Sequence, residues 1–178
     1  MILLGRVALL LALTVSTVAA QSADVPPTPE VFQVFELPLT LTNPALVKTK
    51  HGYLLKCVLA NASEFRQLGF RYSLAIVGAD NMPIVISHNE GFTLSPYQTK
   101  NMTFKTPLRL KLKGDERLVL MVEQAISTDY VWEVVQAKEA LAGYINGDYS
   151  ITPRVLRMLN EVDSREPLRI LYHDLPRY

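Results

Sequence analysis

Cysteine is nearly absent from this sequence of 178 residues. Because Cys57 is its one cysteine, no disulfide can form within the chain. Secreted animal domains commonly depend on such bridges, so their absence favours a bacterial envelope protein. Cys57 falls in residues 53–59, an alternating stretch whose odd-numbered side chains would share one strand face. We therefore expect a buried, unreactive thiol.

Motifs for metal binding and catalysis are missing as well. Neither an H-E-x-x-H pair nor a C-x-x-C pair occurs, and His51, His88 and His173 lie far apart in the sequence, so we expect no metal and no cofactor. There is no G-x-S-x-G elbow and no glycine-rich loop for a nucleotide. The acidic residues can be placed on turns or wet faces, which predicts no catalytic residue among Glu36, Glu90, Asp115, Glu116 and Glu123.

An excess of charge of either sign is also lacking. The chain has 18 basic and 17 acidic residues, and loss of residues 1–20 would make these numbers equal. A neutral chain has no general attraction for nucleic acid or anionic lipid. We therefore expect no nucleic-acid partner and favour a protein partner.

No apolar run is long enough to cross a membrane, which takes about 20 residues. After Arg6, residues 7–20 carry no charge and end in the small residues Val18-Ala19-Ala20. A positive residue followed by a short apolar run and small residues is typical of a secretory signal. We predict that residues 1–20 are a signal peptide, that the protein is secreted or periplasmic, and that no transmembrane segment remains after cleavage.

Composition divides the remaining chain into three parts. Residues 21–30 contain Pro26, Pro27 and Pro29, which excludes a helix and predicts an extended leader. Residues 31–135 have the features of a β domain. Residues 136–178 read as a C-terminal helical segment and tail.

Alternation with a period of two predicts most of the strands, at residues 31–41, 53–60, 70–77, 84–86, 118–122 and 130–135. In residues 108–113, leucines alternate with basic residues before a polar turn, and we interpret 108–122 as a hairpin with one wet face. Strands about ten residues apart without intervening helices favour an antiparallel β-sandwich.

Two helices are expected after the strands. Residues 136–142 are good helix formers, and Gly143 can end the helix. Thr152 as N-cap and Pro153 at the first helical position predict a second helix over residues 153–162. Its apolar stripe would pack on the sheet and consists of Val155, Leu156, Leu159 and Val162.

Part of the sequence resembles a known type of domain. The polar stretch 61–69, the strand 72–77 and the corner Leu-Ser-Pro-Tyr-Gln-Thr at 94–99 look like the middle of immunoglobulin-like domains of bacterial exported proteins. Those domains have a Leu-x-Pro-Gly-x-Thr-like corner, and Tyr97 stands here in place of the usual glycine. The resemblance covers residues 50–126 and implies an immunoglobulin-like β-sandwich.

Residues 31–41 are the first candidate contact surface. Pro38 cannot donate to a ladder and the leader before it is extended, so we predict an edge strand. Such an edge can pair with another chain through its backbone. The apolar side chains at this partner edge would be Phe32, Val34 and Phe35. The alternative is that the C-terminal helices cover the edge.

A cluster of basic residues is the second candidate surface. It consists of Arg109, Lys111, Lys113 and Arg117. The cluster could meet an acidic polymer or partner, or it could be the solvated face of a sheet. No aromatic residue is interleaved with it, which argues against binding of single-stranded nucleic acid.

These features favour an exported, non-catalytic binding or scaffolding module of the cell envelope or extracellular space. A short helical segment would follow its β-sandwich. Two alternatives remain open: a small exported hydrolase whose site is assembled by tertiary contacts, and a structural subunit that pairs through an edge strand.

Overall fold

A computed structural model describes residues 26–148, 150 and 152–160 of the chain, so the predicted signal peptide, part of the leader and the tail after 160 lie outside the described residues. The described part is mainly β, as predicted. It contains nine strands and one helix: β1 (Glu30–Phe32), β2 (Leu39–Thr49), β3 (Gly52–Asn61), β4 (Gln67–Val77), β5 (Pro83–Leu94), β6 (Thr99–Thr103), β7 (Arg117–Ser127), β8 (Tyr130–Val135), α1 (Ala137–Asn146) and β9 (Arg154–Leu159).

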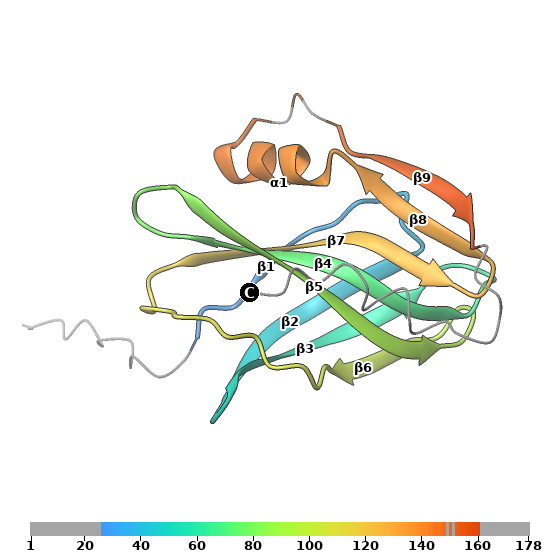
Figure 1. Cartoon of the computed structure of the whole chain (residues 1–178), viewed down its shortest axis with the longest axis horizontal. Coiled ribbons are helices and arrows are strands. Elements are labelled where there is room, and N and C mark those ends of the chain that lie inside the picture. The colour runs from blue at the N-terminus through green and yellow to red at the C-terminus, as the bar shows by residue number, and fades with distance from the viewer. Residues whose placement is uncertain (1–25, 149, 151, 161–178) are drawn as a thin grey trace, which may run out of the picture.

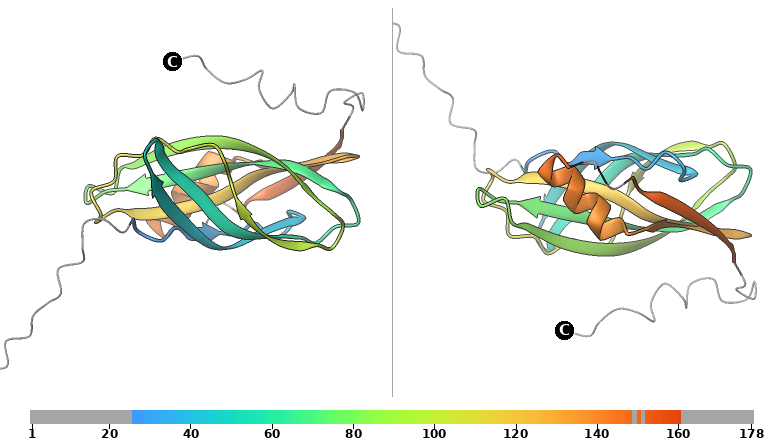
Figure 2. Two further views of the ribbon diagram at one scale, coloured as in Figure 1. Left: turned by 90° about the horizontal axis from the view of Figure 1, so that it is seen from below. Right: turned by 90° about the horizontal axis from the view of Figure 1, so that it is seen from above.

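The strands form two sheets. The larger one has the order β5-β4-β7-β8-β9 and the smaller one the order β2-β3-β6, and neighbouring strands in both are antiparallel. β1 adds the one parallel pairing among the described strands, to residues 119–121 of β7. The two sheets lie face to face, with α1 outside the larger sheet (Figures 1 and 2).

The core between the sheets follows from the alternation seen in the sequence. On β3, Leu55, Cys57 and Leu59 are buried, which confirms the predicted shared face and the buried thiol. On β4, Phe70 and Tyr72 face them from the other sheet and are fully buried. The interior is thus built from the period-two positions of both sheets.

Helix α1 forms a third layer on the outer face of the larger sheet. Its Leu141 and Ile145 belong to the same buried cluster as Val119 and Met121 of β7. This cover explains why the apolar run at 118–122 does not alternate, because a strand buried on both faces needs apolar residues at successive positions. The predicted end of the helix at Gly143 is wrong: the helix continues to Asn146 and is followed by Gly147 with φ 71°.

The hairpin predicted for residues 108–122 does not form. Leu108 pairs with Tyr53 of β3, and residues 109–113 are not a strand. β7 has no edge to offer these residues, because β4 runs along one side of it and β1 and β8 share the other. The alternation nevertheless reports burial: Leu108 is buried and Leu110 half-buried, whereas Arg109 between them is exposed.

The second helix, predicted over residues 153–162, is also wrong. Residues Arg154–Leu159 form β9, which pairs with the whole of β8 from Tyr130 to Val135. The apolar spacing of three and four residues is overruled because the free edge of β8 offers a ladder of backbone hydrogen bonds. The side chains expected to pack in a stripe are therefore divided, with Leu156 and Leu159 exposed.

A cation–π contact helps to hold β9 in place. The guanidinium of Arg157 lies 3.7 Å from the ring centroid of Tyr130 and within 6 Å of those of Phe65 and Trp132. We expect Arg157→Ala to lower the free energy of unfolding by about 1 kcal/mol, and Arg157→Lys to lower it less. Urea denaturation measures both. Equal losses in the two variants would contradict a role for the cation.

Candidate functional site

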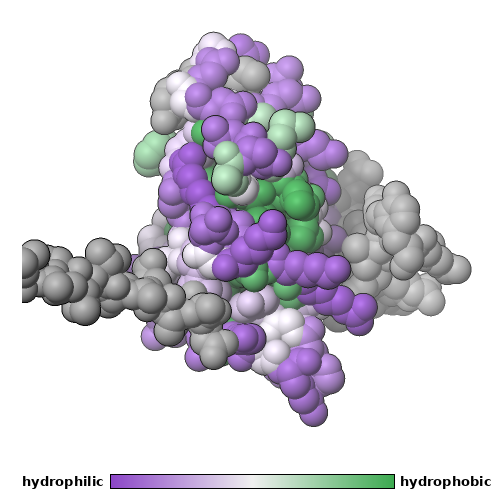
Figure 3. All heavy atoms as spheres, turned by 90° about the vertical axis from the view of Figure 1, so that its left-hand side faces the viewer, coloured by the Kyte–Doolittle hydropathy of each residue, from purple (hydrophilic) through white to green (hydrophobic). Residues whose placement is uncertain are grey.

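An apolar pocket lies at one end of the molecule, where the β4–β5 and β2–β3 hairpins point apart (left in Figure 1). Its volume is about 650 Å³, within the range of ligand pockets. One wall is the β4–β5 hairpin, and the other is the crossing segment, residues 108–116, which leads from the smaller sheet to β7. Viewed from this end, hydrophobic side chains fill a hollow that hydrophilic side chains border (Figure 3).

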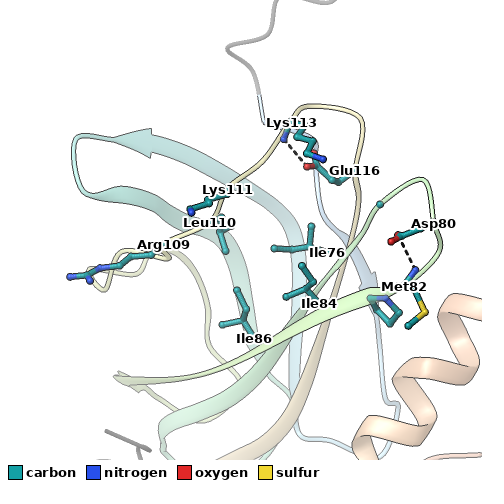
Figure 4. Close-up of a pocket in the computed structure, with 12 residues that line it drawn as sticks. Ile76, Asp80, Met82, Ile84, Ile86, Arg109, Leu110, Lys111, Lys113 and Glu116 are labelled. Atoms are coloured by element: carbon teal, nitrogen blue, oxygen red, sulfur yellow. Dashed lines mark hydrogen bonds between the residues drawn. The ribbon is translucent and has the colours of Figure 1, made fainter. Parts of the chain in front are cut away.

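Isoleucines from two strands form the apolar lining together with Leu110 of the crossing segment. Ile76 of β4 is the register partner of Ile84 on β5, and Ile86 lies two positions further on the same face. Figure 4 shows these four side chains around one common space. Ile84 is 65% exposed although it lies on the inner face of the sheet. The core is therefore open to solvent at this point.

Backbone pairing anchors one end of the crossing segment. The Leu108 N–H donates to the Tyr53 carbonyl at 2.7 Å, and the Tyr53 N–H donates to the Leu108 carbonyl at 2.9 Å. Next to this pair, Gly52 has φ 134°, and a Cβ there would lie 2.3 Å from the Leu108 oxygen. Only glycine permits this close approach.

The other end of the crossing segment is held by Glu116. Its carboxylate accepts the N–H group of Lys113 at 2.6 Å (Figure 4) and that of Gly114 at 2.8 Å. Burial alone would raise the pKa of Glu116, but these hydrogen bonds and the charge of Lys113 hold it below its usual range. Asp80, the other carboxylate of the lining, accepts the Met82 N–H at 3.2 Å. Both carboxylates therefore stabilise the loops that carry them.

Three of the four predicted basic residues meet at this pocket. Arg109, Lys111 and Lys113 are exposed residues of the crossing segment and belong to the lining. We call them the basic rim. Residues 109–113 are not a strand, but the alternation of leucine and basic residues still separates inward from outward side chains. Leu110 turns inward between exposed cations.

Arg117, the fourth basic residue, lies elsewhere. Its guanidinium binds Glu30 of β1 through two bonds of 2.8 and 2.9 Å and donates to the Ile145 carbonyl of α1 at 3.2 Å. Arg117 holds the pKa of Glu30 below its usual range by hydrogen bonding and by its charge. It therefore joins β1, β7 and α1 and is not part of the basic rim.

The residues of the predicted partner edge are separated in the structure. Residues 31–41 are not one strand, because β1 ends at Phe32 and β2 begins at Leu39. Phe32 stacks on Tyr144 of α1 with ring centroids 4.5 Å apart, and Val34 is buried in the core. Phe35 alone of the three projects into solvent, 95% exposed.

A buried polar cluster escaped the sequence analysis. Glu90 was expected on a turn or a solvent-exposed face, but residues 88–91 lie within β5, where His88 and Glu90 face inward beside Tyr72 and Phe70. His88 Nε2 lies 3.5 Å from Glu90 Oε1. The signal was present, because Ile84, Ile86, His88 and Glu90 continue one period-two face.

This cluster also adds to the effect of burial on the cysteine. Burial, with a smaller contribution from the charge of Glu90, raises the pKa of the Cys57 thiol to about 12. A thiol of that pKa stays protonated at neutral pH and is a poor nucleophile. In the part of the chain that the structure describes, no three His, Cys, Asp or Glu side chains come together as metal ligands.

Glu123, which was assigned to a wet surface, is buried on the outer face of the larger sheet. It accepts the hydroxyl of Ser73 and pairs with Arg71 at 3.1 Å. Arg71 also reaches Glu133 of β8 at 2.9 Å. These contacts join β4, β7 and β8, so this carboxylate serves the fold.

No protein-family model matches the chain, and neither a curated protein nor a solved structure matches it. Within residues 26–148, 150 and 152–160, no helix is long and apolar enough to span a membrane. The pocket is therefore interpreted from its own chemistry.

Proposed function

We propose that this chain is an exported, non-catalytic binding module built on an immunoglobulin-like β-sandwich, and that its pocket receives the apolar part of a ligand. The observation that carries the proposal is the open apolar lining of Ile76, Ile84, Ile86 and Leu110. Exposed apolar surface in a concave site is typical of a binding site, because a ligand that covers it removes that surface from water.

The chemistry of the lining favours binding over hydrolysis. Its two carboxylates, Asp80 and Glu116, accept backbone N–H groups of their own loops. A general acid or base needs a carboxyl that is free to reach the substrate, whereas both of these are engaged by their own loops. The protonated Cys57 lies in the core, so it does not supply a nucleophile.

Two features support the immunoglobulin-like arrangement. Tyr97, at the corner position where such domains have glycine, has φ 55°, a backbone conformation that glycine favours. The side chain of Asn61, at the end of β3, donates to the carbonyl of Ser95 in the same corner at 2.9 Å and to that of Phe65 at 2.7 Å. Export is supported by the charge and apolar pattern of residues 1–20.

The test is a pair of substitutions on neighbouring residues of β5. Ile84→Glu places a charge on the lining, whereas Val85→Glu places the same charge on the opposite face, where the side chain is already 42% exposed. We expect the purified protein to bind the uncharged apolar dye N-phenyl-1-naphthylamine. Ile84→Glu should weaken this binding about tenfold or more, because desolvating the new carboxylate is costly.

Fluorescence titration measures the binding, and urea denaturation shows that both variants remain folded. Val85→Glu should change the affinity by no more than about twofold. Equal loss of binding in both variants, or no binding of the dye by the parent protein, would refute the pocket as the binding site.

A further inference from the structure

We propose that the pocket binds a free single-chain anionic amphiphile, a long-chain carboxylate, with its chain on the isoleucines and its carboxylate at the basic rim. This inference rests on the proposed function and adds the chemical class of the ligand. Its basis is the placement of an apolar space beside cations whose counter-charges are already engaged.

At the mouth of the pocket, positive charges outnumber negative ones. The basic rim contributes three cations, whereas Glu116 and Asp80 are occupied by backbone N–H groups. Lys113 already acts on Glu116, since its charge lowers the pKa of that carboxyl. Arg109 and Lys111 form no salt bridge with the described residues and are exposed. They remain available to an anion.

The position of these cations also determines where the anion would sit. Lys111 and Arg109 flank Leu110, whose side chain points to the isoleucines, while Arg109 extends away from them (Figure 4). A carboxylate held there stays at the mouth, in contact with water. An amphiphile bound in this way loses apolar surface to the pocket and keeps its charge hydrated.

The residues that follow Ile86 on the same face of β5 disfavour a ligand that enters with its carboxylate first. Beyond Ile86, β5 carries His88 and then the buried Glu90. Burial raises the pKa of both Cys57 and Tyr72, and the negative charge of Glu90 adds to that rise. A carboxylate inserted first would approach this charge in a poorly solvated interior, which is costly. The alkyl chain of the ligand therefore enters the pocket first.

The number of cations in the basic rim favours a free amphiphile over a membrane surface as the ligand. Clusters that recruit a protein to anionic bilayers contain roughly 4–8 basic residues on an exposed face. Here three cations border a hollow of about 650 Å³. A concave site with few cations suits one chain that enters it better than a planar array of headgroups.

The experiment compares three ligands that share a ten-carbon alkyl chain and differ in their head group. They are decanoate, decanol and decyltrimethylammonium, each below its aggregation concentration. Displacement of N-phenyl-1-naphthylamine from the purified protein reports binding. Decanoate should bind about tenfold more tightly than decanol, and the cationic ligand should bind most weakly. The advantage of decanoate should shrink as salt is raised, because the rim is exposed.

The double variant Arg109→Gln/Lys111→Gln should weaken decanoate binding about tenfold and leave decanol binding unchanged. The matched control, Arg66→Gln/Lys100→Gln, removes the same charge from exposed residues outside the lining and should leave both unchanged. If decanol binds as tightly as decanoate, the inference is wrong and the proposed function stands. If none of the three displaces a dye that does bind, the amphiphile is excluded, and binding to phosphatidylglycerol vesicles alone would replace it with a membrane surface.

Discussion

Leu141→Asp in α1 is expected to lower the free energy of unfolding by about 3–5 kcal/mol, enough to unfold a domain of ordinary stability. Leu141 is 1% exposed and packs with the outer face of the larger sheet. An aspartate there must either be buried without a partner or displace the helix. Displacement would expose Val119 and Met121, which are buried on that face of β7.

Lys138→Asp is the control for this substitution, because Lys138 lies in the same helix with its side chain in solvent. We expect it to change stability by no more than about 0.5 kcal/mol. Urea denaturation followed by circular dichroism measures both variants. If Leu141→Asp removes only helical signal and the sheet unfolds at the parent's midpoint, α1 is an appendage and the three-layer description is wrong.

Phe70→Ala should have an effect of similar size, about 3–5 kcal/mol, by leaving a cavity between the two sheets. The Phe70 side chain is fully buried. Its ring centroid lies 5.3 Å from those of Tyr72 and Phe104 and 5.7 Å from that of Phe92. Tyr72 shares its strand, Phe92 belongs to β5, and Phe104 follows β6, so one ring connects both sheets.

Phe35→Ala makes the same chemical change at an exposed site and should alter the free energy of unfolding by no more than about 0.5 kcal/mol. Equilibrium denaturation in urea compares the two variants. Because we expect Phe35→Ala to leave the fold intact, it also provides a variant for testing whether this part of the predicted edge contacts a partner. A loss below about 1 kcal/mol for Phe70→Ala would contradict the packing described between the sheets.

The period-two alternation of apolar residues predicted the strands well where one face is buried and the other is exposed to solvent. β8 begins and ends at the expected residues, and β3 has its apolar residues on the predicted face. It failed where another element decides the environment of a segment. β9 has a helical spacing of apolar residues, but β8 offers it an edge, and Gly143 does not end α1 because a better terminator, Gly147, follows.

The local pattern also identified one part of the candidate site and missed the other. The basic residues of the rim were identified from their alternation with leucines, and their exposure is a local property of that alternation. The isoleucines opposite them read only as core residues in the sequence. Nothing local distinguishes Ile84, which is exposed, from Ile76, which is buried beside it. The difference follows from the sheet order, because Ile84 lies on the edge strand β5 and Ile76 on β4, which has a neighbour on each side.

Sequence by itself determined that this chain is mainly β, that Cys57 is buried, and that residues 109–113 expose their cations, because each follows from the period of apolar residues within one segment. Tertiary structure alone decided which edges pair, that α1 covers the larger sheet, and that Arg117 binds Glu30 while its basic neighbours border a pocket. These outcomes depend on competition between distant segments for the same edges and faces. That competition is settled by the free energy of the whole assembly, which no single segment encodes.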